Sequence, residues 1–259
     1  MDGPNPYQPP GAALDLPDPE AAEGPRMPWE DPGQHPDRAG RIVATLGILL
    51  RPAEAGPALG GTRRVGPAIT FYLAVGLPLL WAAQVLAAVF KPGAPPPWMG
   101  HFGLPAAPPM APDAQGVQRM IALGAALASP VGMAVSLLIN GAMLHLGLWA
   151  TRGLGQRRGM AVTYRTALYA HAAFGLVASA FALWPLLPAW AALALFAAMA
   201  LFWIAAAVYQ GVLLARAHGT ETWRGVLAVF LPWLAIGCCC GAVGLAAAAA
   251  LGAFGGAFR

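Results

Sequence analysis

Residues 67–90 read PAITFYLAVGLPLLWAAQVLAAVF, a run without a single charged side chain. At 1.5 Å per residue, a helix of this length crosses the ~30 Å hydrocarbon core of a bilayer with some tilt. The run therefore predicts a membrane-spanning helix. Four further apolar runs follow, at about 118–149, 161–183, 190–214 and 225–251.

The composition of the whole chain points the same way. Its 259 residues are 58% hydrophobic and 10% charged, with a mean hydropathy of +0.59. Soluble domains carry about 25% charged residues, so this chain could not cover a soluble globule. The composition excludes a soluble enzyme, and three cysteines are too few for a disulfide-rich secreted scaffold. The predicted fold class is all-α: a polytopic membrane protein with a bundle of five transmembrane helices over residues 67–259.

The segment before the spans has two parts. Residues 1–37 hold eight acidic residues, one basic residue and ten prolines. Proline removes a backbone donor and fixes φ, which predicts a disordered, acidic cytoplasmic tail with polyproline-II character. Residues 38–66 are predicted to be an amphipathic interfacial helix and a linker. The helix would place Ile42, Leu46, Leu49 and Leu50 on one face.

The arginines predict the orientation in the membrane. The loop 150–160 carries Arg152, Arg157 and Arg158, whereas the loop 184–189 carries no charge, and this alternation runs along the chain. The positive-inside rule then places the N-terminus in the cytoplasm and the C-terminus outside. The excess of arginine over lysine, with abundant alanine, glycine and proline, indicates a GC-rich bacterial genome. We therefore expect an integral protein of the bacterial inner membrane.

Catalytic signals are absent from the sequence. No Asp or Glu lies inside the five predicted spans, where carboxylates commonly mark proton or cation pathways. No zinc-protease, P-loop or serine-hydrolase motif occurs either. We predict a non-catalytic protein without a cofactor, a metal or a nucleic-acid partner. Its predicted partners are membrane lipids and one or more proteins, and a homo-oligomer fits as well.

Polar and small residues inside the spans are the candidates for function. Ser136, Asn140, His145, Tyr169 and His171 could line a binding site or hold neighbouring helices together. Pro78, Pro130 and Pro232 are predicted to kink their helices, and broken helices can free carbonyls to line a site. The spacing of Gly237, Gly241 and Gly244 predicts close packing of the fifth span, within the chain or between two copies.

The order of several features between residues 28 and 250 resembles the Yip family of Ypt/Rab-interacting membrane proteins, in its bacterial form. Pro28-Trp29-Glu30 precedes the interfacial helix, and TYRTALYA and WPLLPAW come later. The family-motif positions are Tyr209, Gly211, His218 and Pro232. Ala55-Gly56 departs from the bacterial pattern, which usually has Phe there. The resemblance implies a five-span bundle with a cytoplasmic N-terminal region, and eukaryotic members bind small GTPases in vesicle traffic.

Two functional interpretations stay open. The first is a membrane-organising or adaptor module that binds partners through its cytoplasmic tail and the loops 150–160 and 215–224. The alternative is a small-molecule transporter or a lipid-handling membrane protein that uses the kinked helices.

Overall fold

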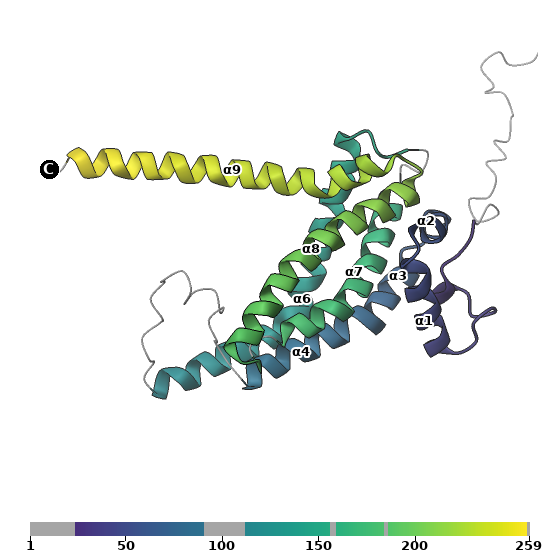
Figure 1. Ribbon diagram of the computed structural model, residues 1–259, viewed down its shortest axis with the longest axis horizontal. Helices are drawn as coiled ribbons and strands as arrows, with labels where there is room; N and C mark the ends of the chain where they lie inside the picture. Colours follow the sequence, from purple (N-terminus) through teal and green to yellow (C-terminus); the bar gives the residue numbers. More distant parts are fainter. Residues whose placement is uncertain (1–23, 91–111, 156–158, 184–185, 258–259) are drawn as a thin grey trace, which may run out of the picture.

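The computed structural model describes residues 24–90, 112–155, 159–183 and 186–257 (Figure 1). These residues form helices and connections without a strand. The elements are η1 (Pro28–Glu30), α1 (Arg38–Leu49), α2 (Pro52–Gly60), α3 (Gly66–Phe71), the π-helical η2 (Tyr72–Gly76), α4 (Leu77–Phe90), α6 (Pro112–Ala150), α7 (Met160–Ala182), α8 (Ala189–His218) and α9 (Thr222–Ala257). The protein is an all-α polytopic membrane protein, as predicted.

Four of the described helical stretches are long and apolar enough to cross a membrane: Gly66–Phe90, Gly116–Ala150, Leu193–His218 and Thr222–Cys239. The number rises to five if α1 and α2, which meet at 112°, form one broken span. The predicted third span, α7, is a helix of 23 residues but is not among the four. The described residues thus contain four or five segments that are long and apolar enough to cross a membrane.

The position of α7 explains its polar composition. It packs against α2, α4, α6 and α8, and Figure 1 shows it among these helices. Thr163, Arg165 and Thr166 on α7 are fully buried. Because protein rather than lipid surrounds these side chains, α7 does not need to be apolar on every side.

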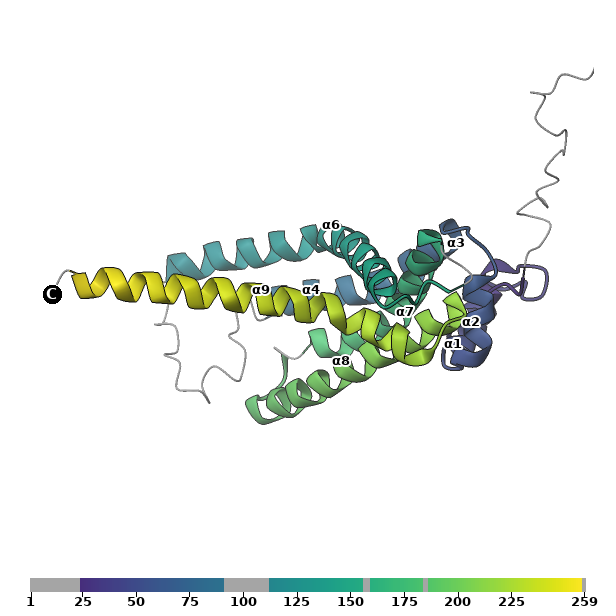
Figure 2. The same cartoon turned by 90° about the horizontal axis from the view of Figure 1, so that it is seen from above.

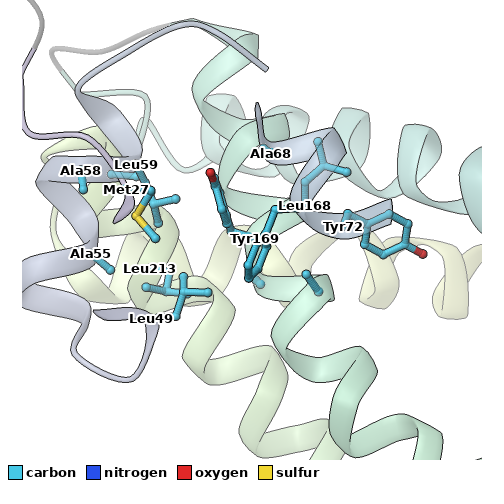
Figure 3. Close-up of a cluster of buried hydrophobic side chains, with 14 of the residues drawn as sticks. Met27, Leu49, Ala55, Ala58, Leu59, Ala68, Tyr72, Leu168, Tyr169 and Leu213 are labelled. Carbon is cyan, nitrogen blue, oxygen red and sulfur yellow. The ribbon is translucent and has the colours of Figure 1, made fainter. Parts of the chain in front are cut away.

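The largest buried core lies at one end of the bundle, where the N-terminal segment packs on α3, α7 and α8 (Figure 3). Met27, Leu49, Leu59, Tyr169 and Leu213 are among its fully or almost fully buried members. Most other large apolar side chains of the long helices are exposed, including Trp149, Trp190 and Leu201. An apolar surface of this extent fits a lipid environment rather than water.

The N-terminal segment differs from its prediction. Residues 1–23 lie outside the described residues, but residues 24–37, predicted as part of the disordered tail, include η1 and pack on the bundle. Residues 38–66, predicted as an amphipathic helix and a linker, contain the two helices α1 and α2, and α2 packs on α8. Leu49 of α1 is buried and Ile42 and Leu46 are half-buried, whereas Leu50 is 79% exposed. The apolar face of α1 thus packs largely on protein.

The three prolines have different effects on their helices. Pro78 lies in the first turn of α4, directly after the π-helical turn η2. Pro130 and Pro232 lie within α6 and α9, which continue past them, and Figure 2 shows α6 changing direction along its length. The carbonyl of Ala126, which Pro130 leaves without a helical donor, accepts bonds from the Trp81 indole (3.1 Å) and the Ser129 hydroxyl (2.8 Å). This freed carbonyl is therefore satisfied within the protein.

The close packing predicted around Gly237 does not occur within the described part of the chain, and its alternative, packing between two copies, stays a prediction. No described atom of a neighbouring segment lies within 4 Å of the position that a Cβ would take there, and the described side chains 233–239 are exposed. The surroundings of Gly241 and Gly244 lie outside the described side chains. Figure 1 shows the second half of α9 running away from the other helices.

Candidate intramembrane groove

A groove with a cavity volume of about 610 Å³ lies among α6, α7, α8 and α9. Its polar lining consists of Ser136 and Asn140 from α6, His171 from α7 and Gln210 from α8. Three of the five polar candidates predicted from the sequence, Ser136, Asn140 and His171, thus meet at one site. The rest of the lining is small, aliphatic or aromatic: Gly132, Val135, Ile139, Met143, Phe174, Trp203, Ala206, Ala207, Val229, Phe230 and Trp233.

Asn140 and His171 form the polar centre of the groove. The Asn140 side-chain nitrogen lies 3.4 Å from Nε2 of His171, and Nδ1 of His171 lies 2.8 Å from the carbonyl oxygen of Ala167. A carbonyl only accepts, so Nδ1 carries the proton and donates to Ala167. Nε2 of the neutral ring then accepts from the Asn140 amide. The pair is satisfied without a charge.

Gln210 provides a donor that the described protein does not use. Its side chain is only 7% exposed, and its Nε2 is buried without a hydrogen-bond partner among the described residues. A buried unsatisfied donor costs about 1–3 kcal/mol, and folded proteins keep few of them. Gln210 therefore presents an open hydrogen-bonding position in the groove lining.

The groove opens at the bundle surface, and its residue His171 lies near the middle of α7. His171 is eleven residues beyond the start of α7, which corresponds to ~17 Å along the axis. This is about half of the ~30 Å hydrocarbon core. Val135, Ile139, Trp203 and Trp233 are lining residues that are also exposed on the outer surface of the helices. The groove therefore opens on the surface of the bundle that faces lipid.

The other two polar candidates lie elsewhere. His145 places Nδ1 3.0 Å from the Thr163 hydroxyl, which lies 3.0 Å from Nε2 of the buried family-motif residue His218. Tyr169 points to the opposite side of α7 and donates to Glu30 (2.6 Å). The predicted polar set is thus divided into three separate sites.

The remaining family-motif positions have packing roles. A Cβ on Gly211 would come within 2.5 Å of the Val226 Cα, so α8 and α9 cross there in backbone contact. Tyr209 lines a separate, apolar cavity of about 490 Å³ among α1, α7 and α8. Pro232 is buried within α9, between the groove residues Phe230 and Trp233.

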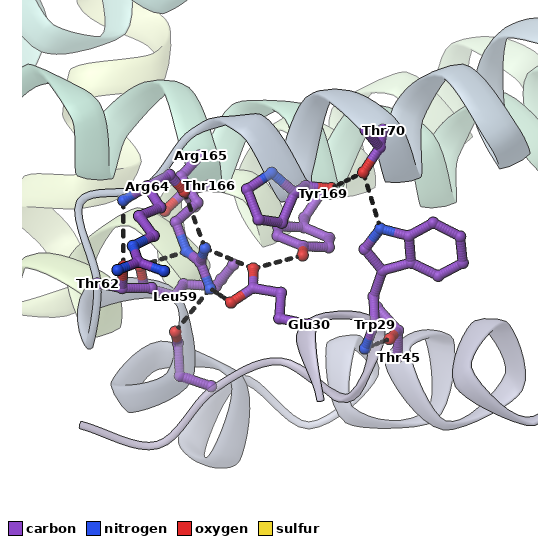
Figure 4. A network of polar contacts seen from close by, with 12 residues as sticks. Trp29, Glu30, Thr45, Leu59, Thr62, Arg64, Thr70, Arg165, Thr166 and Tyr169 are labelled. Atoms are coloured by element: carbon purple, nitrogen blue, oxygen red, sulfur yellow. Dashed lines mark hydrogen bonds and ion pairs between the residues drawn. The ribbon is translucent and has the colours of Figure 1, made fainter. Parts of the chain in front are cut away.

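A second polar cluster fixes the N-terminal segment on α7 (Figure 4). Arg165, fully buried, forms an ion pair with Glu30, with Nη2 donating to Oε2 at 2.7 Å. Its other donors reach the carbonyls of Leu59 (3.0 Å), Arg64 (3.1 Å) and Ala58 (3.1 Å). Glu30 is almost completely buried as well, and it also accepts from Tyr169.

Trp29 reinforces the same attachment. Its backbone N–H donates to the Thr45 hydroxyl (2.8 Å) and its indole donates to Thr70 (3.0 Å). The ring packs edge-on against Phe71, with 5.5 Å between the centroids, and the guanidinium of Arg41 lies over it. Pro28-Trp29-Glu30 is therefore a docking element for residues 24–37 rather than a feature of a free tail.

Sequence reasoning missed Gln210, Glu30, Arg165 and Thr163 as functional or structural polar residues. Arg165 lies inside the predicted third span, 161–183, where an arginine requires a counter-ion, but the sequence does not identify that partner. Glu30 is part of the Pro28-Trp29-Glu30 motif of the resemblance, but nothing in the sequence marks it, among the eight acidic residues of the tail, as the ion-pair partner of Arg165. Gln210 lies in a stretch that reads as an ordinary apolar span, and no spacing pattern marks it.

The groove has the chemistry of a binding site. No side chain among its described lining is Asp, Glu, Lys or Arg, and no group of three or more His, Cys, Asp or Glu in the described chain could hold a metal ion. Neutral hydrogen-bonding groups inside an apolar, aromatic wall suit the recognition of a molecule with a polar end and an apolar body. A scan against models of protein families finds no match, and searches of curated proteins and of solved structures find none either.

Proposed function

We propose that this protein is a non-catalytic, lipid-handling membrane protein that binds an amphiphilic molecule in the groove among α6, α7, α8 and α9. The observation that carries the proposal is the convergence of Ser136, Asn140, His171 and Gln210 in one apolar groove that opens at the lipid-facing surface. An amphiphile can enter from the bilayer and place its polar end against these groups.

The helices around the groove support this proposal. Gly132 lies two residues after Pro130 in α6, and Phe230 and Trp233 bracket Pro232 in α9. Proline removes a helical hydrogen bond and bends a helix. Two of the four helices that line the groove thus contain a proline within or next to the lining.

The test is the amount of lipid that stays with the purified protein. Native membranes would be solubilised, the protein exchanged into fresh detergent, and retained lipids identified by mass spectrometry. The double variant Asn140→Leu/His171→Leu is expected to retain at least tenfold less of the specific lipid, because the polar centre is lost. Gln84→Leu on α4, outside the groove, is the control and should retain the wild-type amount. A folded double variant with wild-type lipid content would refute the groove as a binding site.

A second candidate function is that of an adaptor. Residues 24–37 are held on the bundle by Trp29 and Glu30, and the acidic, proline-rich residues 1–23 precede them in the sequence. We propose that this segment docks a basic or aromatic-lined protein, because a polyproline-II segment costs little ordering entropy on binding.

We further propose membership of the Yip family, on the order of the motifs in the sequence, and location in a bacterial inner membrane with the N-terminus in the cytoplasm. The alternation of arginine-rich and arginine-poor loops supports this orientation. Protease added to inverted vesicles, but not to intact spheroplasts, would then remove residues 1–23. Cleavage only from the outside would overturn the orientation.

A further inference from the structure

We propose that the ligand of the groove is an uncharged lipid whose polar end offers a hydrogen-bond acceptor to Gln210. This inference rests on the proposed lipid-handling function and specifies the chemical class of the ligand. Its polar end would carry a carbonyl or hydroxyl oxygen, as in a diacylglycerol, an isoprenoid alcohol or a quinone.

The first argument is the state of Gln210. Its Nε2 is buried and has no acceptor among the described residues, although the side chain lines the groove. A ligand oxygen in the groove would complete this bond. Discrimination by such a group is strong, because a ligand that lacks the acceptor leaves the buried donor unpaired.

The second argument is the absence of charge. The described lining contains no Asp, Glu, Lys or Arg. His171 does not act as a cation, because its Nδ1 donates to Ala167 and its Nε2 accepts from Asn140. An ionised head group placed here would lose its hydration without gaining a counter-ion. The groove therefore selects against phosphate, carboxylate and ammonium groups.

The third argument is the shape of the site. About 610 Å³ holds a small head group and the first part of an apolar chain. The exposed lining residues Ile139, Trp203 and Trp233 place the opening at the lipid-facing surface, so the rest of the chain can stay in the bilayer. A small water-soluble solute would leave much of this apolar wall without a contact.

A matched pair of lipids tests the inference. Dioleoylglycerol and dioleoylphosphatidic acid carry the same acyl chains and differ in the charged phosphate. Binding of each would be titrated by native mass spectrometry with the full-length protein in detergent. We expect dioleoylglycerol to bind the wild type at least tenfold more tightly than phosphatidic acid. Equal binding of the two, or preference for phosphatidic acid, would overturn the inference.

Variants connect this preference to Gln210. Gln210→Met keeps the size of the side chain but removes the donor, and should weaken dioleoylglycerol binding about tenfold or more, the factor that corresponds to ~1.4 kcal/mol. Gln84→Met is the control on α4 and should bind as the wild type does. If Gln210→Met does not fold, Gln210→Leu also removes the donor and leaves an apolar side chain in the groove wall. Unchanged dioleoylglycerol binding in a folded Gln210 variant would overturn the inference.

The outcomes separate this inference from the function on which it rests. If phosphatidic acid binds and Asn140→Leu/His171→Leu abolishes that binding, the groove is a lipid site and only the uncharged class is wrong. If neither lipid binds the wild type and native membranes leave no retained lipid, both proposals fail together.

Discussion

The guanidinium of Arg165 is buried where lipid or a packed core would otherwise tolerate no charge. Its charge is tolerated there because the Glu30 carboxylate and the backbone carbonyls of Ala58, Leu59 and Arg64 accept hydrogen bonds from it. Arginine has five donors in a planar fork, and only such a group can serve acceptors from several directions at once. A lysine at this position would leave some of these acceptors without a hydrogen-bond donor.

Glu30 is therefore expected to contribute far more to the stability of the fold than an exposed carboxylate does. Glu30→Ala leaves Arg165 buried with no counter-ion and should destabilise the protein by about 3–5 kcal/mol. Glu54→Ala breaks the Arg51–Glu54 pair, whose side chains are 69% and 55% exposed, and should cost about 0–1 kcal/mol.

The measurement is thermal and denaturant unfolding of both variants in the same detergent. Limited proteolysis adds a second readout, because Glu30→Ala should also release residues 24–37 from the bundle and expose them to cleavage. Equal stability of the two variants would show that the buried pair does not hold the N-terminal segment.

The crossing of α8 and α9 depends on two glycines that face each other. Gly211 and Gly225 place backbone against backbone, and a Cβ on Gly225 would come within 2.7 Å of the Ala215 Cβ. Gly219, with φ of 65°, ends α8 in a left-handed conformation and allows the short connection to α9. The two helices therefore turn back on each other with almost no linker.

Gly211→Ala is expected to force these helices apart and to destabilise the protein by about 1–3 kcal/mol, the usual range for overpacking. Gly237→Ala is the matched control, because no described neighbour lies within 4 Å of its added methyl group. It should be neutral or slightly stabilising, because alanine favours a helix over glycine. Thermal melts of the two purified variants decide the matter. A destabilised Gly237→Ala beside a neutral Gly211→Ala would contradict this packing.

The whole molecule consists of a helical bundle and an N-terminal segment, residues 24–37, that packs on one end of it. Trp29 and Glu30 join residues 24–37 to α1, α3 and α7, and the largest buried core forms where these parts meet. The first 37 residues therefore do not act as one unit.

Two truncations are expected to behave differently. Deletion of residues 1–23 should leave the unfolding temperature unchanged. Under the adaptor proposal, the shortened protein should also no longer co-purify with its protein partners from native membranes. Deletion of residues 1–37 also removes Glu30 and Trp29, and should lower the unfolding temperature markedly, because Arg165 loses its counter-ion. Crosslinking with co-purification and thermal melts measure both effects. If the longer deletion were as stable as the shorter one, the docking element would have no structural role.

The sequence alone determined the fold class, because apolar runs of membrane-spanning length allow few other structures. It also identified Ser136, Asn140 and His171, since polar groups are conspicuous in an apolar helix. It failed where the outcome depended on partners far along the chain. Proline content suggested a free tail through residue 37, although Glu30 is buried against Arg165 of α7.

Only the tertiary structure decided which polar residues meet. His145, Tyr169 and His171 look equivalent in the sequence, yet each faces a different neighbour: Thr163, Glu30 and Asn140. The direction in which a helical side chain points is local, but its partner depends on how the helices cross. Those crossings follow from close backbone contacts such as Gly211 with Val226, and the same contacts place Gln210, one residue away, in the groove.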